Sequence, residues 1–436
     1  MTVFAMAEAV RNGTSTATFA VEQALAAIER GNPVLNAVTR TLPARALARA
    51  AEIDRAAAQG LPLGPLAGVP FGVKDLFDVA GLPTTAGAGM RRDAAPALRD
   101  ADAIVRLEAA GAILVATLNM DEFAYGFATI NAAFGTTRNP HDPERLAGGS
   151  SGGSAAAVGG GLLPFTLGSD TNGSVRVPAS LCGVFGLKPT HGALPMGGVF
   201  PFVESFDDIG PFARSAAELE QLWRVLGGSD AVAESPTRIA RLGGWFARDL
   251  APELAEALEG LGLPTVELPG VERARSAAFL MTAAEGGALH LPELRTRALD
   301  YDPATRSRLI AGATLPASIY FAAQAYRERF RRAVLQLFER FDVLVAPTTA
   351  DVAPLVDDPV VTVAGARVPA RAHLGIFTQP LSFVGLPVIA APLHRPGKLP
   401  LGIQLVGPPG SEARLFALAR RLEAEGVVAA TPVPAA

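Results

Sequence analysis

The feature of this sequence that most limits its fold is a set of short, strongly apolar runs that recur along the chain. Each run is too short for a buried helix and is bounded by glycine, proline or charged residues, as fully buried strands are. Strands buried on both faces need helices above and below them, so we predict an α/β fold with one large sheet. The runs occupy residues 112–118, 162–170, 341–347, 385–393 and 401–408.

The stretches between these runs read mainly as helices, and together they indicate a single domain of four segments. Val21, Leu25 and Ile28 recur at helical spacing in the first segment, and the third segment is mostly helix-like and is expected to shape substrate choice. We predict N-terminal helices at 1–60, a core with the candidate catalytic residues at 61–215, a mainly helical insertion at 216–340, and strands and a helix that complete the sheet at 341–436.

Two helix starts are predicted from capping residues. One helix is expected to begin after Asp100 or Asp102, because an aspartate side chain accepts hydrogen bonds from free backbone N–H groups. Another is expected at Ser215, where Glu218 three residues later completes a capping-box pattern.

Composition and charge exclude several classes of protein. The formal net charge of −4 gives no basis for binding nucleic acid or acidic lipid. The single Cys182 excludes an internal disulfide framework, and the five histidines lack the spacing of a zinc or iron site. We therefore expect no metal and no cofactor. The N-terminus has no basic region ahead of an apolar stretch, so we predict a cytoplasmic protein.

An uncharged stretch from residue 147 to residue 169 is long enough to cross a bilayer. It contains eight glycines and Pro164, which lower its helix propensity, and it lacks the continuous large apolar residues that insertion requires. We therefore predict no membrane span here.

The segment that carries chemistry is a glycine- and serine-rich stretch at residues 146–190, with Ser150 and Ser174 separated by 24 positions. Glycines beside a serine let the backbone take unusual conformations and let a carbonyl group approach main-chain N–H groups, as acyl transfer requires. Such a loop also occurs as a structural turn or as a phosphate cradle. Neither GxxxxGK[ST] nor a complete GxGxxG is present, which disfavours the cradle.

A hydrolase elbow is another interpretation, because residues 148–152 satisfy the GxSxG pattern. That class also needs an aspartate or glutamate and a later histidine. His373 and His394 are late enough in the chain, but neither has recognisable catalytic surroundings. The elbow is therefore the weaker interpretation.

The segments around these serines resemble the amidase signature family. The resemblance is carried by GGSSGGSAAAV, by GSDTNGSVRVPASLCGVFGLKPT and by PLAGVPFGVKDLFDVAGLPTT upstream, with supporting segments at 119–140, 206–215 and near the end of the chain. It implies an α/β/α fold with a mixed sheet and a catalytic triad without metal or organic cofactor. The implied triad is Lys74, Ser150 and Ser174, with Ser174 as the nucleophile and Ser150 after a cis peptide bond.

The family also implies an oxyanion hole built from the backbone N–H groups of Thr171, Asn172, Gly173 and Ser174. Asp170 and Arg176 flank this turn and are expected to pair with each other or with nearby backbone, as scaffold.

Lys74 is the candidate base, since no histidine is positioned to deprotonate a serine. A neutral lysine at pH 7 needs a pKa about 3 units below its usual value, which burial or nearby positive charge supplies. Ser150 would then relay the proton between Ser174 and Lys74. The competing interpretation of Lys74 is a surface ion pair with Asp75 or Asp78, but its place in an apolar strand favours burial.

Two further side chains have structural alternatives. Cys182 lies in an apolar run and is expected to be an inert core residue. Tyr125 and Phe127 either line the pocket or fill the core, and the core is favoured.

Within the family, the chain is similar to enzymes that act on biuret-type amides, since Asn172 stands where many members carry glycine. This similarity implies release of ammonia from a small, linear, anionic amide such as 1-carboxybiuret. Gly148, Gly149, Tyr125 and Arg306 are candidate substrate contacts, and Arg308 is a second candidate beside Arg306, although both arginines are also typical of a solvent-facing helix.

One departure from the family pattern concerns the residues after KPT. The family usually continues YGR, whereas this chain has His191, Gly192 and Ala193, so the usual arginine is missing or its task is done differently.

The resemblance leaves two other functions open. The chain is alternatively the A-type component of a glutamyl-tRNA(Gln)-type amidotransferase, which is a glutaminase that channels ammonia, or a general aliphatic amidase. The implied partners are the small amide substrate, a small helical protein similar to the C-type component of those amidotransferases, and a second copy of the chain in a dimer.

Overall fold

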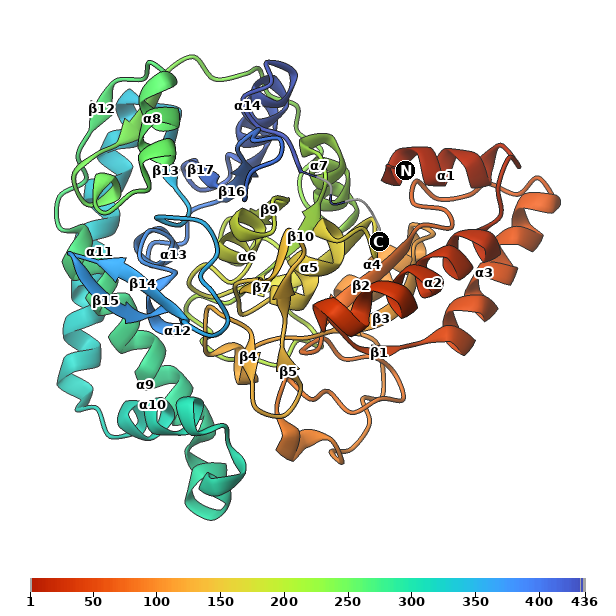
Figure 1. Ribbon diagram of the computed structural model, residues 1–436, viewed down its shortest axis with the longest axis horizontal. Coiled ribbons are helices and arrows are strands. Elements are labelled where there is room, and N and C mark those ends of the chain that lie inside the picture. Colours follow the sequence, from red (N-terminus) through yellow and green to blue (C-terminus); the bar gives the residue numbers. More distant parts are fainter. Residues whose placement is uncertain (1, 432, 434–436) are drawn as a thin grey trace.

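The computed structural model describes residues 2–431 and 433, and its centre is one mixed sheet of eleven strands (Figure 1). Strand β2 is parallel to β3 and β8, and β11 is parallel to β12 and β13, whereas the other neighbours are antiparallel. The order across the sheet is β1 (Val38–Thr41), β3 (Ile113–Leu118), β2 (Pro70–Lys74), β8 (Phe165–Asp170), β10 (Asp208–Ala213), β9 (Phe185–Lys188), β16 (Val388–Pro392), β17 (Gly402–Val406), β13 (Val343–Pro347), β11 (Ile239–Leu242) and β12 (Thr265–Val266).

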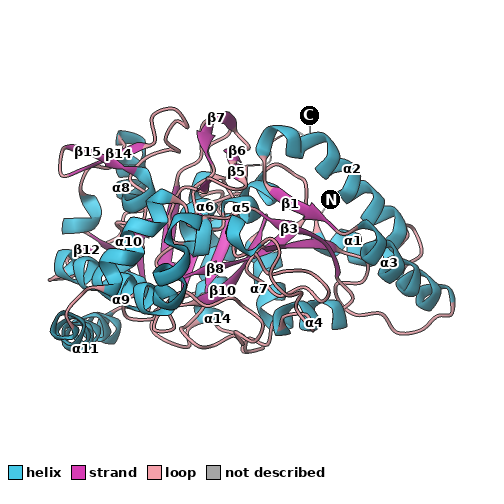
Figure 2. Ribbon diagram, turned by 90° about the horizontal axis from the view of Figure 1, so that it is seen from below, coloured by secondary structure: helices cyan, strands magenta, loops and turns pink. Residues whose placement is uncertain are grey.

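Helices cover both faces of this sheet, as Figure 2 shows. On one face lie α2 (Ala17–Leu35), α3 (Pro43–Ala58), α5 (Gly152–Gly159) and α6 (Arg176–Leu181). On the other lie α4 (Asp102–Ala109), α7 (Ala216–Val225) and α14 (Glu412–Ala424). The predicted α/β fold with helices on both faces is confirmed.

The remaining elements lie at the edges of this core. The helices are α1 (Val3–Arg11), α8 (Pro252–Gly260), α9 (Val271–Arg297), α10 (Pro303–Ala313), α11 (Ala317–Arg340), α12 (Ala370–His373) and α13 (Gln379–Ser382). Single 3-10 turns occur at Gly89–Arg91, Glu122–Ala124, Gly244–Ala247 and Ala298–Asp300. Three small hairpins pair β4 (Ile130–Asn131) with β5 (Gly135–Thr136), β6 (Arg138–Asn139) with β7 (Asp142–Leu146), and β14 (Val360–Val363) with β15 (Ala366–Pro369).

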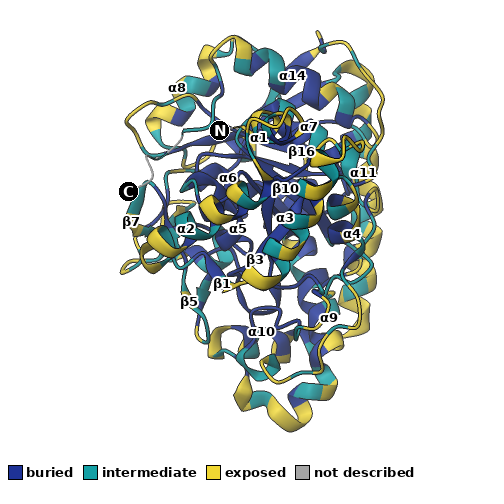
Figure 3. Ribbon diagram, turned by 90° about the vertical axis from the view of Figure 1, so that its right-hand side faces the viewer, coloured by how far each residue is buried: buried dark blue, intermediate teal, exposed yellow. Residues whose placement is uncertain are grey.

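Strand β3 illustrates why the apolar runs form this sheet. Ile113 and Val115 belong to the core under α2, α3 and α5, whereas Leu114 belongs to the core on the opposite face. Successive side chains of a strand point to opposite faces, so a strand covered on both sides must be apolar throughout. Figure 3 shows the result, with a buried interior and exposed residues on the outer helix surfaces and at the end near α10.

The predicted strands at 112–118, 162–170, 341–347, 385–393 and 401–408 are present as β3, β8, β13, β16 and β17. Residues 1–60, predicted as helices, also contain one short strand, and residues 216–340, predicted as mainly helical, consist mostly of helix with two short strands. Strand β1 interrupts residues 1–60, and β11 and β12 lie within residues 216–340. All three are short strands at or near the sheet edges, and they lack the long apolar run by which the other strands were recognised.

One of the two predicted helix caps is confirmed. Ser215 Oγ accepts the N–H of Glu218, and the Glu218 carboxylate accepts the N–H of Arg214. The other is wrong, because Ala101 occupies the cap position of α4 and makes no side-chain cap bond. Asp100 instead pairs with Arg45, with an Nη1–Oδ1 distance of 2.8 Å.

The uncharged stretch at 147–169 forms α5 and most of β8. Within the described part of the chain, no helix combines the length and the apolarity needed to cross a membrane.

Candidate active site

The candidate triad gathers where β2 and β8 end. Lys74 is the last residue of β2, and Ser174 lies in the turn between β8 and α6. Because β2 and β8 are parallel neighbours, their carboxyl ends lie at the same edge of the sheet, where α/β proteins commonly bind ligands. Ser150 reaches this edge from the start of α5, which packs over both strands.

Lys74 is fully buried and contacts two hydroxyl groups. Its Nζ lies 2.7 Å from Ser150 Oγ and 2.9 Å from Ser169 Oγ. Burial lowers the pKa of Lys74 to about 7, although the carboxylates of Asp121, Asp207 and Asp170 act to raise it. The amine is therefore about half neutral at pH 7 and mostly neutral about one pH unit higher, where it is able to accept a proton.

The alternative interpretation of Lys74 as a surface ion pair is wrong. The Asp75 carboxylate accepts a hydrogen bond from the Thr85 hydroxyl, and the Asp78 carboxylate accepts one from the Thr84 hydroxyl.

Ser150 follows a cis peptide bond from Gly149, as the family resemblance implies. Its carbonyl accepts the N–H of Asp121 at 3.2 Å. A Cβ at Gly149 would lie 2.3 Å from Asp121 Oδ2, so only glycine fits there. Gly148 packs in the same way against the backbone of Pro178. The two glycines thus shape the approach to Ser150.

The turn that carries Ser174 is held by Asp170 and Arg176, both fully buried. Arg176 Nε and Nη2 each lie 2.9 Å from an oxygen of Asp170, and the Asp170 carboxylate also accepts the N–H groups of Gly173 and Val175. Burial acts to raise the pKa of Asp170, but the charge and hydrogen bonds of Arg176 outweigh it, so this pKa lies below its usual value. The predicted scaffold pair is confirmed.

The same contacts correct one detail of the predicted oxyanion hole. The Gly173 amide donates to Asp170 Oδ1 at 2.7 Å, so it is not free for a substrate oxygen. The amides of Thr171, Asn172 and Ser174 donate to no atom in the part of the chain that the structure describes. These three amides remain the candidate donors.

Asp207 fixes the start of this turn. Its carboxylate accepts the Thr171 hydroxyl at 2.6 Å and the backbone N–H groups of Phe202 and Val203 at 2.8 Å. Burial raises the pKa of Asp207 to about 6. Thr171 and Phe202 both line the pocket described next, so the Asp207 carboxylate positions two of its lining residues.

The segments that carry Ser150 and Ser174 are joined by a backbone hydrogen bond. The Ser151 N–H donates to the Ser174 carbonyl at 3.3 Å. No hydrogen bond joins the hydroxyl groups of Ser150 and Ser174 within residues 2–431. Ser174 instead lines a small pocket.

That pocket is formed by aromatic, amide and hydroxyl side chains around one arginine. Its lining comprises Ala124, Tyr125, Gly126, Phe127, Thr171, Asn172, Ser174, Phe202, Phe279, Thr282, Arg308 and Gln379. The Arg308 guanidinium stacks 3.6 Å from the centre of the Tyr125 ring, and its Nη1 donates to the Tyr125 carbonyl at 3.0 Å. Tyr125 and Phe127, for which the core was favoured, therefore also form pocket walls.

Three candidate substrate contacts do not line this pocket. Gly148 and Gly149 pack behind Ser150, and Arg306 is half-buried on α10 outside the lining. The sequence offered Arg306 and Arg308 as alternative substrate contacts, and Arg308 is the one that lines the pocket. A two-residue step turns a helical side chain by more than half a turn, so one arginine faces inward and the other does not.

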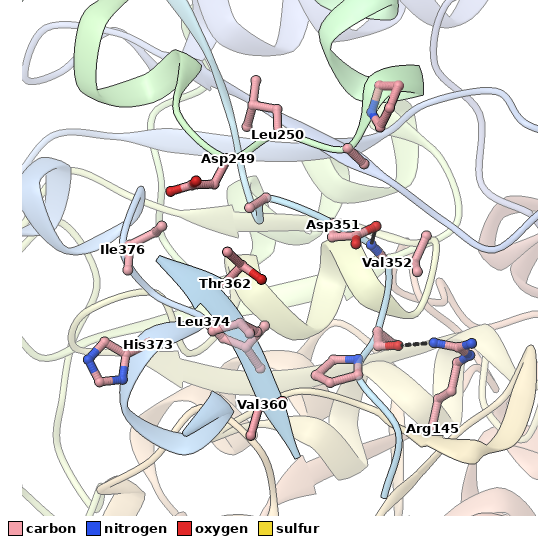
Figure 4. A pocket seen from close by; sticks show the side chains of 16 residues that line it. Arg145, Asp249, Leu250, Asp351, Val352, Val360, Thr362, His373, Leu374 and Ile376 are labelled. Atoms are coloured by element: carbon pink, nitrogen blue, oxygen red, sulfur yellow. Dashed lines mark hydrogen bonds between the residues drawn. The ribbon is translucent and has the colours of Figure 1, made fainter. Parts of the chain in front are cut away.

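A larger pocket lies elsewhere, between the segment that leads into α8, the β14–β15 hairpin and α12 (Figure 4). Its labelled side chains include Arg145, Asp249, Asp351 and His373, and the one hydrogen bond drawn runs from Arg145 to the Ala353 carbonyl. None of the triad residues lines it. The candidate triad therefore does not lie in the larger of these two pockets.

The departure from the family pattern at His191 has a structural counterpart. Asp208 is buried and accepts Lys188 Nζ at 2.8 Å and the Gly192 N–H at 3.0 Å, while His191 Nδ1 lies 3.2 Å from it. His191, which replaces the usual residue of the family pattern, is thus one of the groups around the buried Asp208 carboxylate.

Cys182 is fully buried, and its thiol donates to the Ala147 carbonyl at 3.3 Å. Burial raises the pKa of the thiol well above its usual value, so the predicted inert core role agrees with its surroundings. Among the described residues, no group of three or more His, Cys, Asp or Glu side chains is placed to hold a metal ion.

Several site residues were missed from the sequence. Ser169 was detectable, with Thr166 and Asp170, as one of the polar side chains in the strand that leads to Ser174. Thr282 and Gln379 lie more than 100 residues after Ser174, on α9 and α13, and nothing in their local sequence links them to the nucleophile.

Comparison with known proteins supports this chemistry. A family model described as Amidase matches residues 20–261 and 247–416. AtzE, which forms part of the 1-carboxybiuret hydrolase of Pseudomonas sp. (strain ADP), is 43% identical, covering 96% of this chain and 97% of that protein. The A-type component of the glutamyl-tRNA(Gln) amidotransferase of Chloroflexus aurantiacus (strain ATCC 29366 / DSM 635 / J-10-fl) is 36% identical, covering 95% of this chain and 94% of that protein.

A solved structure is similar to this chain over nearly its whole length. It is described as the inhibitor-bound form of a vestigial protein complex that reveals the origins of an s-triazine catabolic enzyme. It superposes with a TM-score of 0.94 at 42% identity and covers 99% of this chain and 100% of that chain. On the family match, these relatives and the shared fold, the chain belongs to the amidase signature family of amidohydrolases.

Proposed function

We propose that this amidohydrolase releases ammonia from a small, linear ureido amide that carries a carboxylate, such as 1-carboxybiuret. The observation that carries the proposal is the pocket beside Ser174, whose described lining contains the Arg308 guanidinium and no carboxylate. Such a pocket attracts an anionic substrate and offers it a bidentate partner. The similarity to a component of a 1-carboxybiuret hydrolase supports the same substrate class.

In the proposed reaction Ser174 Oγ attacks the carbonyl carbon of the amide. For this step the Ser174 hydroxyl turns toward Ser150, gives its proton to Ser150 Oγ, and Ser150 gives its own proton to Lys74 Nζ. Lys74 accepts it because burial lowers its pKa to about 7. Negative charge develops on the carbonyl oxygen, where the free amides of Thr171, Asn172 and Ser174 are the proposed donors.

The tetrahedral intermediate then collapses and the C–N bond breaks. The leaving nitrogen takes a proton from Ser150, which is resupplied by the Lys74 ammonium, and ammonia departs. The acyl group remains on Ser174 as an ester. Water attacks this ester, and its proton returns through Ser150 to Ser174 Oγ, which restores the enzyme.

Two other functions make different demands on the pocket. The similarity to the A-type component of an amidotransferase raises glutamine as a substrate. Glutamine carries an α-ammonium group whose charge a carboxylate would balance, and the described pocket lining contains no carboxylate. A general aliphatic amidase has no use for the partly buried Arg308 in its pocket, because withdrawing an unpaired charge from water is costly.

The experiment that tests the proposal measures ammonia release by the purified chain from 1-carboxybiuret, biuret, malonamide and glutamine in parallel. We expect 1-carboxybiuret to have the highest kcat/KM. Glutamine turnover above that of 1-carboxybiuret, or turnover that begins only after an amidotransferase partner is added, would replace this proposal by the amidotransferase function.

Replacing Arg308 with alanine is expected to lower kcat/KM for 1-carboxybiuret by about 10- to 100-fold, since a hydrogen bond between charged groups contributes about 1.5–3 kcal/mol. Biuret lacks the carboxylate and should lose much less. The measurement is the ratio of kcat/KM for the two substrates, because loss of stacking on Tyr125 affects both of them equally.

The matched control is Arg306→Ala on the same helix, which leaves the pocket lining unchanged. This variant should keep the wild-type ratio. An equal loss for both substrates in Arg308→Ala, or a changed ratio in Arg306→Ala, contradicts the assigned role of Arg308.

The proposal includes the partners that the sequence suggested, namely a small helical protein similar to the C-type component of amidotransferases and a second copy of the chain. The description of the closely similar solved structure as a protein complex supports a partner of this kind.

A further inference from the structure

Asn172 lines the pocket and carries a buried acceptor without a partner among the described residues. Asn172 is two residues before Ser174, is only 5% exposed and lines the same pocket. Its Nδ2 donates to Thr282 Oγ1 at 2.8 Å, which leaves Oδ1 free. This oxygen is buried and has no hydrogen-bond partner in the described part of the chain.

Asn172 is held in this position from two sides. Its carbonyl accepts the Thr378 hydroxyl at 2.6 Å, and the next residue, Gly173, packs so tightly on Thr378 that a Cβ would lie 2.0 Å from Thr378 Oγ1. Thr282 belongs to α9, which also brings Phe279 to the pocket. Thr378 therefore holds the backbone of Asn172 and Thr282 holds its side-chain Nδ2, with Oδ1 left as the acceptor without a partner in the described part of the chain.

A buried acceptor without a partner is unfavourable, and a ligand N–H that reaches it removes this cost. Asn172 is two residues before Ser174, and the scissile carbonyl of the substrate must lie over Ser174. The N–H group that reaches Asn172 Oδ1 must therefore be close to the acyl carbon of the substrate. In a ureido amide, the atom bonded to the acyl carbon opposite the leaving nitrogen is an N–H. In an aliphatic amide of the same length it is a CH2 group.

We infer that Asn172 Oδ1 selects ureido amides by accepting a hydrogen bond from the N–H that adjoins the acyl carbon. The inference rests on the proposed hydrolysis of ureido amides and adds the residue that separates them from their CH2 counterparts. Tyr125, whose hydroxyl is also buried without a partner among the described residues, supplies a second polar contact in the same pocket.

Biuret and malonamide form the matched substrate pair, since they differ only in a central NH or CH2. We expect the wild-type chain to prefer biuret by about 10- to 100-fold in kcat/KM, as a site with a fixed acceptor rejects an analogue that lacks the donor. Asn172→Ala should lower kcat/KM for biuret more than for malonamide by about the same factor, so that the preference disappears, whatever effect the change beside Ser174 has on both substrates.

Variants at Thr282 provide the control for orientation. Thr282→Ser keeps the hydroxyl that holds Asn172 Nδ2 and should keep the preference, whereas Thr282→Val releases the amide and should reduce it. The melting temperature of each variant shows whether it is folded, and comparing Thr282→Ser with Thr282→Val separates recognition from a general loss of fold.

The outcomes distinguish this inference from the proposed function. Equal wild-type kcat/KM for biuret and malonamide, or a preference that survives Asn172→Ala, overturns the role of Asn172 and leaves the hydrolase function standing. Turnover of 1-carboxybiuret without turnover of either member of the pair overturns the inference as well, because the N–H alone should suffice. No turnover of any ureido amide overturns the proposed function itself.

Discussion

Ser174→Ala should lower kcat on 1-carboxybiuret by at least about 10³-fold, because alanine has no oxygen to form the acyl-enzyme ester. Loss of the nucleophile in serine hydrolases leaves only the contributions of substrate binding and the oxyanion donors. KM should change little, since the Arg308 and Asn172 side chains are untouched. Ammonia release under saturating substrate measures this effect.

Ser180→Ala is the matched control for this substitution. Ser180 is also buried and lies on α6 directly after the nucleophile turn, but its hydroxyl faces Thr349 at 3.3 Å and does not line the pocket. Its turnover should stay within a few-fold of wild type. If Ser174→Ala kept turnover close to that of Ser180→Ala, the nucleophile would have to be another residue.

Lys74→Met should abolish turnover to a similar degree and at the same time stabilise the fold. Methionine fills a similar volume but cannot accept the proton that Ser150 relays. Wild-type activity should rise with pH through about 7 and then level off, since the neutral amine is the base and the pKa of Lys74 is about 7. The residual activity of Lys74→Met should show no such rise.

The stability change follows from the same pKa. The folded-state pKa lies below the unfolded value of about 10.4, so the unfolded chain binds the extra proton and the lysine destabilises the fold. This cost is fully present below pH 7 and fades as the pH rises toward 10. After allowing for the lost contacts with Ser150 and Ser169, we expect Lys74→Met to raise the free energy of unfolding at pH 7 by about 2 kcal/mol.

The exposed Lys398 offers the control, since Lys398→Met should alter neither turnover nor stability. Chemical denaturation at pH 6 and pH 9 measures the second effect. A Lys74→Met variant that is less stable than wild type at pH 6 would show that the amine is not held in a neutral, desolvated state.

The architecture was predictable wherever a strand is buried on both faces. Strands β13 and β16 are continuous apolar runs, and β3 and β17 are interrupted only by Thr117 and Gln404, because all four strands are buried throughout. Strand β1 was not predictable in this way, since Arg40 and Thr41 face solvent at the sheet edge and its pairing with β3 is decided by tertiary contact. The helix cap at Asp100 failed for a similar reason, because a distant Arg45 competes for the carboxylate.

The candidate site likewise contains residues that the sequence could identify and residues that it could not. Ser150, Ser174 and Asp170 were identifiable because a single dense segment contains them. The depth at which Lys74 is buried, the Gly173 amide taken by Asp170, and the contact of Asn172 with Thr282 depend on elements that only the folded chain brings together. Arg306 and Arg308 were equivalent candidates in the sequence. Only the directions in which α10 points their side chains separate the two.

The partners of Arg176 also have a consequence for biosynthesis. Its Nη1 donates to the Thr378 carbonyl at 3.1 Å and to Gln404 Oε1 at 2.8 Å, groups that lie 202 and 228 positions later in the chain. Until these segments leave the ribosome, the guanidinium would be buried with too few partners, which is unfavourable. We therefore expect a nascent chain to complete the turn that carries Ser174 only after residue 404 has been synthesised, and we expect products truncated before that residue to lack hydrolytic activity.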